Sequence, residues 1–560
     1  MVNVLKRRGL WGDAVLLLLG LSGLVVGSYQ AFLLTSVVIT ALLCLSVGVT
    51  TERAGMVSLA QVAMAGVGAW VATWLLARQP ALGPWLALVA ATLVPAAMAV
   101  VLAMPTLRVR GVNLAIVTLA FSLVVNLFLT RAGFPGAEVG FAYERSGWLE
   151  SDAHLLLLCA LLGIAISRAL VWMEQRPFGA AWFGIKFSER AVAAFGISVP
   201  QAKVSSFAVA AGIAGLAGGL MVLQLGALSS RNFEPMASLG LFALAVLSHA
   251  RFLSGALIAA VLTWFTPELL TSVGLAEWKD IGDLIFALGA LHALHGRSKA
   301  AVPAKAGELN NEGHPLPLKP RLLEPGHPGE LTLQELTVSY GATRAVDAVT
   351  LTIRRGSVTG LVGPNGAGKS SLVDAVSGFT RASGGVSLDG VPIGSMSVSE
   401  RARLGLRRTF QVGRAIPELT VGQYVRLASR GLPDAATLDS VLEWMGCPGA
   451  DSSIASLDVG TRRLVEIAAA LLSQPRVLLL DEPAAGMSAP ESHRLGEIIR
   501  RIPDAFGCTV LLIEHDLALI RNVCSELVVL EFGQVIAKGP VEETLALPHV
   551  VDAYIGGVAA

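Results

Sequence analysis

The chain has 560 residues, a formal net charge of +1, 15% charged residues and a mean hydropathy of +0.65. An ordinary soluble protein is roughly 25% charged, so this composition indicates membrane spans, and the apolar content excludes a disordered chain. The near-zero net charge argues against a nucleic-acid binder. Residues 1–300 hold 32 of the 83 charged residues, so the first half resembles a membrane domain and the second a soluble one. The five scattered cysteines indicate neither a disulfide framework nor a metal site.

Apolar runs separated by short polar segments fill the first half. A run needs about 20 apolar residues to cross roughly 30 Å of hydrocarbon. We expect about ten spans, with nine or eight as alternatives because several runs are short. The candidate spans are residues 14–27, 31–49, 56–77, 85–104, 112–130, 155–173, 204–226, 236–250, 252–270 and 281–295.

The charges around these runs predict the topology. Lys6, Arg7 and Arg8 precede the first run, which could imitate a secretory signal, but no convincing small-residue cleavage site follows. We therefore expect the first span to be retained. Basic residues are more frequent in the loops that ten spans would place inside the cell, so both ends of the chain are predicted to be cytoplasmic.

Small residues inside the spans have one interpretation, whereas the polar residues there have two. Small residues such as Gly215 and Gly219 predict close helix packing. Polar residues within spans either form hydrogen bonds between helices or line a substrate path. These polar residues are Gln61, Asn113, Asn126 and Gln224.

Residues 298–329 are rich in proline and polar residues, which predicts an extended tether. Strand-like and helix-like stretches alternate after it, as in an α/β domain. Within this part, one stretch matches the phosphate-loop pattern G-x-x-x-x-G-K-[ST], with an apolar strand over 357–362 before it and a helix-like run from Ser371. The loop consists of Gly363, Pro364, Asn365, Gly366, Ala367, Gly368, Lys369 and Ser370.

The loop predicts binding of ATP with Mg²⁺. Its glycines let backbone N–H groups surround phosphates at a helix N-terminus, Lys369 would reach the β- and γ-phosphates, and the Ser370 hydroxyl would ligate Mg²⁺. A second apolar strand, 476–480, ends at Asp481 and Glu482. Asp481 suits Mg²⁺ coordination, and Glu482 can polarise the attacking water. A further strand, 509–513, is followed by His515. Together with the phosphate loop and the carboxylates, this position makes His515 a candidate for sensing the phosphate.

Residues 330–560 resemble an ATP-binding cassette (ABC) ATPase. Gln411, in the sequence Arg-Thr-Phe-Gln, matches the family's glutamine loop, which contacts Mg²⁺ and communicates with the membrane subunit. Tyr340 lies at the adenine-stacking position, with an ordinary strand-end aromatic as the alternative. The stretches 481–487 and 549–556 resemble the ATPases of branched-chain amino-acid importers in particular. The resemblance implies catalytic roles for Glu482, His515 and Gln411, nucleotide contacts from Tyr340, residues 363–370, Ser371 and Asp481, and Mg²⁺ ligation by Ser370, Gln411 and Asp481.

The first half is similar to the permeases of the same importers, over residues 54–61, 107–119 and 176–197. In that family the last stretch contains the cytoplasmic coupling helix, which docks on the ATPase. The expected fold is therefore a polytopic α-helical membrane domain over 1–297, the tether, and an α/β P-loop ABC ATPase domain over 330–560. The resemblance implies ATP-driven import of branched-chain or other hydrophobic amino acids across the cell inner membrane. It also implies a second permease, a second ABC ATPase and an external solute-binding protein as partners.

The chain departs from this family at the signature that an ABC ATPase lends to its partner's nucleotide site. Residues 457–461 read Leu-Asp-Val-Gly-Thr, so Asp458 replaces the family's serine and Thr461 its glutamine. A carboxylate there would repel the γ-phosphate unless it turns away. Three alternatives stay open: import of urea, short amides or aromatic acids, an ABC exporter, and a membrane-anchored regulatory ATPase.

Overall fold

The computed structural model describes residues 2–78, 83–106, 111–135, 143–272, 320, 325–411, 415–430 and 433–555. The chain divides into two compact units, one made of Met1–Lys186 and Pro200–Val302, the other of Phe187–Val199 and Pro303–Ala560. Residues 187–199 therefore belong to the second unit, although they lie in the sequence between helices of the first. The predicted tenth span, 281–295, and most of the predicted tether fall outside the described residues.

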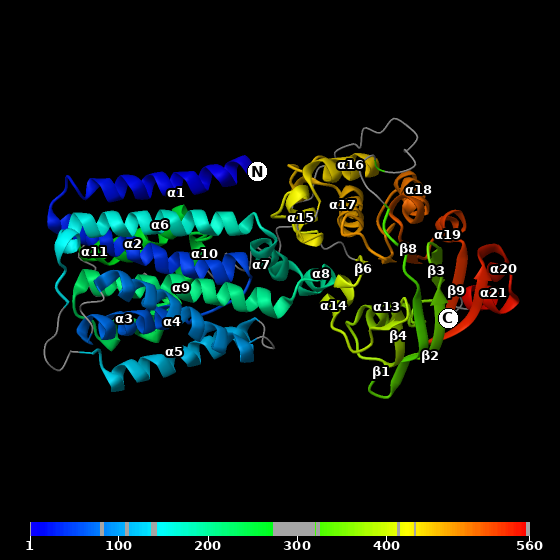
Figure 1. Ribbon diagram of the computed structural model, residues 1–560, viewed down its shortest axis with the longest axis horizontal. Helices are drawn as coiled ribbons and strands as arrows, with labels where there is room; N and C mark the ends of the chain where they lie inside the picture. Colours follow the sequence, from blue (N-terminus) through cyan, green and yellow to red (C-terminus); the bar gives the residue numbers. More distant parts are fainter. Residues whose placement is uncertain are drawn as a thin grey trace. The chain divides into compact units, whose positions relative to one another are not determined.

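The described part of the first unit is a set of packed helices, in which α2 lies against α6 and α11 (Figure 1). Nine of the predicted spans coincide with helices, and five helices are long and apolar enough to cross a membrane. Three shorter apolar helices accompany them among the described residues. The helices are α1 (Val2–Ser22), α2 (Ser28–Gly48), α3 (Gln61–Arg78), α4 (Gly83–Thr106), α5 (Val112–Ala132), α6 (Asp152–Glu174), α7 (Pro177–Phe187), α9 (Val199–Leu225), α10 (Pro235–Leu247) and α11 (Leu253–Ser272), with short turns at Val49–Arg53, Gly147–Glu150 and Ser230–Phe233.

The predicted span 56–77 is not helical throughout, because residues 56–60 form no regular secondary structure and α3 begins at Gln61. The N–H of Leu59 donates to Thr118 Oγ1 at 3.0 Å, and its carbonyl accepts from Ser122 Oγ at 2.7 Å. Side chains of α5 thus replace the backbone partners that a helix would supply, which a buried break in an apolar region requires.

The polar residues inside the predicted spans mostly join helices. Asn126 donates to the carbonyls of Ser230 and Phe233, and Gln224 donates to Phe32 O and to Ser36 Oγ. Asn113 is exposed. Gln61 contacts Thr50 Oγ1 at 3.4 Å, while its Oε1 is buried without a hydrogen-bond partner. For Asn126 and Gln224 the interhelical interpretation accounts for the side-chain contacts.

A buried ion triad joins three segments of the first unit. Arg53 Nε lies 2.6 Å from Glu174 Oε1, and Arg251 Nη2 lies 3.1 Å from Glu174 Oε2. Arg251 also stacks over the Phe183 ring at 4.2 Å. Removing one member would leave a buried charge without its counter-ion, which is strongly destabilising.

The second unit contains an antiparallel sheet in the order β2-β1-β4-β5 and a six-stranded sheet in the order β10-β9-β3-β8-β7-β6, parallel except for the β9–β10 pair. Apolar residues of both sheets pack around α13. The strands are β1 (Leu331–Tyr340), β2 (Thr343–Ile353), β3 (Val358–Val362), β4 (Ser383–Leu388), β5 (Val391–Pro392), β6 (Leu406–Arg408), β7 (Val477–Asp481), β8 (Thr509–Ile513), β9 (Glu526–Glu531) and β10 (Gln534–Pro540). The helices are α8 (Glu189–Ala194), α13 (Lys369–Ser377), α14 (Val398–Arg403), α15 (Val421–Ala428), α16 (Ala435–Met445), α17 (Val459–Leu471), α18 (Ala489–Phe506), α19 (Leu517–Val523), α20 (Val541–Leu545) and α21 (Pro548–Ile555), with a short turn at Ile454–Ser456.

Three neighbouring parallel strands carry the predicted site residues at their carboxyl ends. Ile513, the last residue of β8, pairs with Leu361 of β3 on one side and with Asp481 of β7 on the other. The segments that follow these three strands therefore start from one edge of the sheet. This edge is where ligands bind in open α/β sheets.

The packing of α9 against α3 generates the first prediction. A Cβ atom at Gly218 would lie 1.9 Å from the carbonyl oxygen of Ala65, whereas at Gly212 the nearest atom, Thr92 O, is 3.4 Å away. Gly218→Ala should therefore destabilise the first unit by about 1–3 kcal/mol through overpacking. Gly212→Ala is the matched control and should be neutral or stabilising, because alanine has the higher helix propensity. Thermal unfolding of the full-length chain in detergent checks both, and equal melting temperatures would contradict the close approach.

Candidate functional site

The phosphate-loop stretch connects β3 to α13, and two of its glycines cannot be replaced without a clash. Gly363 has a φ of 153°, and a Cβ atom there would lie 2.1 Å from Leu530 O. Gly368 has a φ of 98°, and its Cβ would lie 2.1 Å from Ala345 O. The sequence motif thus has a steric cause as well as a functional one, because the loop must pass close to neighbouring backbone.

Lys369 is buried at the start of α13, and its ammonium group faces the loop. Its Nζ donates to the carbonyls of Gly363 and Pro364, at 2.6 and 2.9 Å. Burial lowers the pKa of Lys369, while the nearby charges of Glu482 and Asp481 oppose that shift. The side chain therefore bonds its own loop and lies near the carboxylates at the end of β7.

Glu482 brings together residues from three separate segments. Its Oε2 accepts a 2.6 Å hydrogen bond from Gln411 Nε2, and its Oε1 lies 2.8 Å from His515 Nε2. The backbone of Glu482 has a φ of 45°, in the left-handed region, which for a non-glycine residue costs about 1–3 kcal/mol. Its N–H is held by Ile513 O at 2.9 Å. The strained backbone aims the carboxylate at Gln411 and His515.

The remaining predicted nucleotide contacts lie on two elements. Ser370 and Ser371 are in the first turn of α13, directly after Lys369. Tyr340 ends β1 in the antiparallel sheet, where it is 52% exposed and its hydroxyl lies 3.5 Å from Thr380 Oγ1. An exposed ring is free to stack on a planar group, so the geometry leaves the adenine-stacking prediction open.

The predicted Mg²⁺ ligands supply the donor atoms that this ion prefers. A hydroxyl from Ser370, a carboxylate from Asp481 and an amide oxygen from Gln411 are all hard oxygen donors. Among the residues that the structure describes, no three His, Cys, Asp or Glu side chains lie close enough to hold a metal. The donor set therefore fits an ion that completes its shell with phosphate oxygens and water, as Mg²⁺ usually does.

Three charged residues that the motifs did not single out hold the site in place. Arg463 of α17 donates through both terminal nitrogens, to the carbonyls of Phe410 and Gln411. Arg408 bonds Asp481 at 2.8 Å and also pairs with Asp374 of α13. The signal that could have found Arg408 is its sequence position shortly before Gln411, because two adjacent arginines in a buried strand need polar partners.

Asp458 caps its own helix. It is the N-cap residue of α17, and its carboxylate accepts from the Thr461 N–H and the Thr461 hydroxyl, both at 2.7 Å. One backbone donor at this helix N-terminus is therefore already satisfied by an internal anion. The position of Asp458 agrees with the alternative that its carboxylate is turned toward its own backbone.

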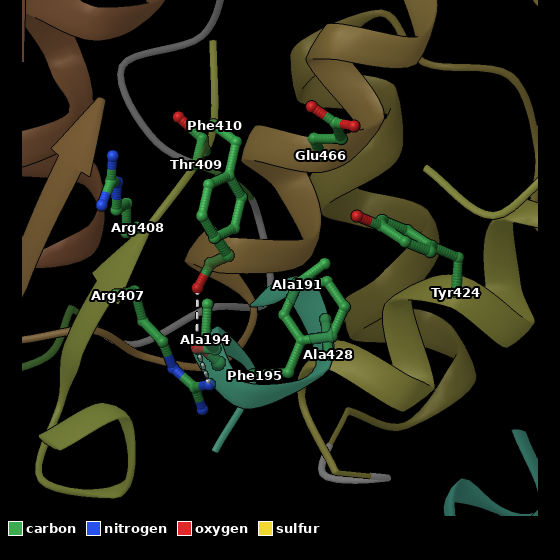
Figure 2. Close-up of a pocket in the computed structure, with 12 residues that line it drawn as sticks. Ala191, Ala194, Phe195, Arg407, Arg408, Thr409, Phe410, Tyr424, Ala428 and Glu466 are labelled. Carbon is green, nitrogen blue, oxygen red and sulfur yellow. Dashed lines mark hydrogen bonds between the residues drawn. The ribbon is translucent and has the colours of Figure 1, made fainter. Parts of the chain in front are cut away.

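The segment that contains α8 is packed into the second unit (Figure 2). The carbonyl of Ala194, at the end of α8, accepts a 3.1 Å hydrogen bond from Arg407 Nη1. The Phe195 ring meets the Tyr424 ring edge-on, with 5.6 Å between centroids. Both rings border one pocket together with Phe410. This segment, predicted as a coupling helix, thus has an aromatic anchor and a capped carboxyl end.

Comparisons with known proteins agree with this architecture. A family model described as a branched-chain amino acid transport system permease component matches residues 29–288, and an ABC transporter model matches 346–485. The high-affinity branched-chain amino acid transport ATP-binding protein BraF of Pseudomonas aeruginosa is 32% identical over 248 residues, which cover 40% of this chain and 97% of that protein. The corresponding protein LivG of Escherichia coli is 31% identical over 253 residues, with the same coverage. A solved nucleotide-free ATP-binding cassette from an ABC transporter has 27% identity and a TM-score of 0.37, and its match covers 41% of this chain and 99% of its own.

These matches cover both halves of the chain. The predicted membrane part and the predicted ATPase part each have their own family, and the ATPase part spans nearly the whole length of its relatives. A nucleotide-binding P-loop ATP hydrolase that drives transport is thus joined to a membrane part, an architecture that points to a complex with other subunits. The chain belongs to the ABC transporter family, as a permease domain of the branched-chain amino-acid transport type fused to its ATPase domain.

Proposed function

We propose that this chain imports branched-chain or other hydrophobic amino acids, using ATP hydrolysis in its second unit. The observation that carries the proposal is that the phosphate loop, Asp481 and Glu482 all start from one edge of a parallel sheet, in a unit that also contains α8. The substrate class rests on the similarity to BraF and LivG, whose names state branched-chain amino acid transport. Import of urea, short amides or aromatic acids is the second candidate. Uptake of a panel of radiolabelled solutes by a deletion strain expressing the chain with its partners would decide between them.

Each site residue has a distinct role in this proposal. The loop 363–370 and Ser371 bind the phosphates, Lys369 neutralises the β- and γ-phosphates, and Tyr340 stacks on the adenine. Mg²⁺, held by Ser370, Asp481 and Gln411, would supply charge neutralisation on the phosphate oxygens. Glu482 orients and polarises the attacking water, and His515 holds Glu482 and senses the γ-phosphate.

The catalytic assignment predicts the effect of two substitutions. Lys369→Ala and Glu482→Gln should each lower ATP hydrolysis at least about a hundredfold, because they remove a phosphate counter-charge and a water-activating base. Solute uptake should fall with hydrolysis while the melting temperature stays close to that of the unaltered chain. Uptake at the unaltered rate in either variant would disprove the assignment.

Because residues 187–199 pack into the ATPase unit, we expect a substitution in this segment to lower solute uptake more than it lowers ATP hydrolysis. Phe195→Ala removes the aromatic anchor against Tyr424 and should lower uptake per ATP hydrolysed about tenfold. Phe532→Ala is the control, because Phe532 is an exposed aromatic residue between β9 and β10, outside residues 176–197. Reconstituted proteoliposomes allow both rates to be measured on one sample. An unchanged ratio for Phe195→Ala would exclude a coupling role for this contact.

The proposed complex contains a second permease, a second ABC ATPase and an external solute-binding protein, in the cell inner membrane. The ATPase unit and both chain ends lie on the cytoplasmic side, where ATP is available. The proposed division of the chain is a permease over 1–297, a tether over 298–329 and the ATPase over 330–560. The positive-inside distribution of basic residues supports this orientation.

A heteromeric assembly is proposed because the Asp458 carboxylate occupies its own helix terminus, and not because it points at a phosphate. In a homodimer both nucleotide sites would receive the Leu457–Thr461 segment, whose helix terminus is already occupied by the Asp458 carboxylate. The chain purified alone should therefore hydrolyse ATP slowly, and a second ATPase subunit with a serine signature should restore turnover. In the complex, Asp458→Ser combined with Thr461→Gln should raise hydrolysis. A fully active homodimer would refute the heteromer, and a large loss in the double variant would mean that these residues function as they stand.

A further inference from the structure

A continuous chain of charged side chains leads from α8 to the end of β7, within the second unit. Arg190 Nη2 of α8 donates to Asp374 Oδ2 at 2.6 Å. The other oxygen of Asp374 pairs with Arg408 Nη1, and Arg408 Nη2 donates to Asp481 Oδ2 at 2.8 Å. Arg408 therefore bridges two carboxylates, and Asp374 bridges two arginines.

Packing keeps this chain in one geometry. The side chains of Arg408 and Asp481 are only 6% and 8% exposed. The Arg408 guanidinium lies 5.1 Å from the Phe410 ring, and that of Arg190 lies 4.6 Å from the Phe379 ring. Phe379 and Phe410 also contact each other, edge to face, with 5.7 Å between centroids. The Arg408–Asp481 pair is therefore screened little by water, whereas Arg190 at the other end of the chain is 45% exposed.

The last link of the chain competes with metal binding. Asp481 is the carboxylate proposed to ligate Mg²⁺, and its Oδ2 is engaged by the Arg408 guanidinium. A cation next to that oxygen lowers its affinity for a second cation. Asp374 influences how strongly Arg408 binds Asp481, because the two oxygens of Asp374 are divided between Arg190 and Arg408.

Loss of Arg190 and loss of the Asp374 charge should have opposite consequences for the ion pair between Arg408 and Asp481. If Arg190 leaves, Asp374 has only Arg408 to bind, so the guanidinium shifts toward Asp374 and releases Asp481. If Asp374 loses its charge, Arg408 has only Asp481 to bind, and the competing ion pair becomes stronger.

We propose that Asp374 and Arg408 are positioning residues through which α8 sets the affinity of Asp481 for Mg²⁺. When Arg190 is bound to Asp374, Arg408 holds Asp481 and weakens metal binding. When α8 moves and Arg190 leaves, Asp481 is released to the metal. This proposal rests on the proposed function, because it requires Asp481 to be a metal ligand and α8 to move during transport.

The test measures metal binding rather than turnover. The full-length chain in lipid nanodiscs is saturated with a non-hydrolysable ATP analogue, and Mn²⁺ is titrated as the probe, with free Mn²⁺ read by electron paramagnetic resonance. Arg190→Gln should tighten Mn²⁺ binding about fivefold, and Asp374→Asn should weaken it about fivefold, at the lower end of the usual coupling between linked sites. Arg354→Gln is the control, since Arg354 pairs with Glu526 and has no part in the chain of ion pairs. It should leave Mn²⁺ affinity unchanged.

The same two substitutions in an Arg408→Lys background distinguish the proposed relay, which is the ion-pair chain from Arg190 to Asp481, from the simple removal of a charge. Arg408→Lys keeps the positive charge, but a lysine cannot bridge two carboxylates with two fixed nitrogens. In this background Arg190→Gln and Asp374→Asn should no longer change Mn²⁺ affinity. If both effects persist there, they are long-range electrostatics and the relay is refuted. Arg408→Gln provides the same comparison should the lysine variant fail to fold.

The nucleotide itself distinguishes failure of the relay from failure of the proposed function. Binding of the ATP analogue is measured in excess chelator on the same samples. If the unaltered chain binds neither the analogue nor Mn²⁺, the proposed ATPase site is wrong. If it binds both, but Arg190→Gln and Asp374→Asn shift Mn²⁺ affinity in the same direction or not at all, only the relay is wrong.

Discussion

The parallel pairing of β3, β8 and β7 is the constraint on which the ATPase unit depends. Because Ile513 pairs with both Leu361 and Asp481, the phosphate loop, Glu482 and His515 all begin at one level of the sheet. Each strand is fully buried, so a slip in register would expose apolar residues as well as misplace the site. Stability and function therefore select the same strand pairing.

Polar groups at the site bind one another. Lys369 bonds the carbonyls of its own loop, Glu482 is shared by Gln411 and His515, and Asp481 is bound by Arg408. Buried charges require such partners, since an unpaired one costs several kcal/mol (roughly 3–5). Under the proposed function, nucleotide binding would exchange these internal partners for phosphate and metal, and the affinity of the site would be the difference between the two sets of bonds. Residues that hold the internal bonds, such as Arg408, would then influence that affinity without touching the substrate.

In the first unit, buried backbone groups and buried charged side chains also have specific polar partners. The non-helical residues before α3 are tolerated because Thr118 and Ser122 bond both backbone polar groups of Leu59. The buried Glu174 is tolerated because Arg53 and Arg251 each hold one of its oxygens. Helix ends and breaks in this unit are thus connected by specific polar bonds, while its glycines set how closely α3 and α9 approach.

The sequence by itself determined the two-part composition, nine of the helices at predicted spans and the phosphate loop, because apolar run length and a loop of fixed spacing are local properties. It also nominated Gln411, Glu482 and His515, which the structure joins. It could not reveal the break before α3, since residues 56–60 are as apolar as a helix there. Nor could it reveal that Asp458 caps α17, or that Arg190, Asp374 and Arg408 form a path to Asp481. Those contacts join residues up to 184 positions apart, and only the tertiary structure decides which buried charges meet.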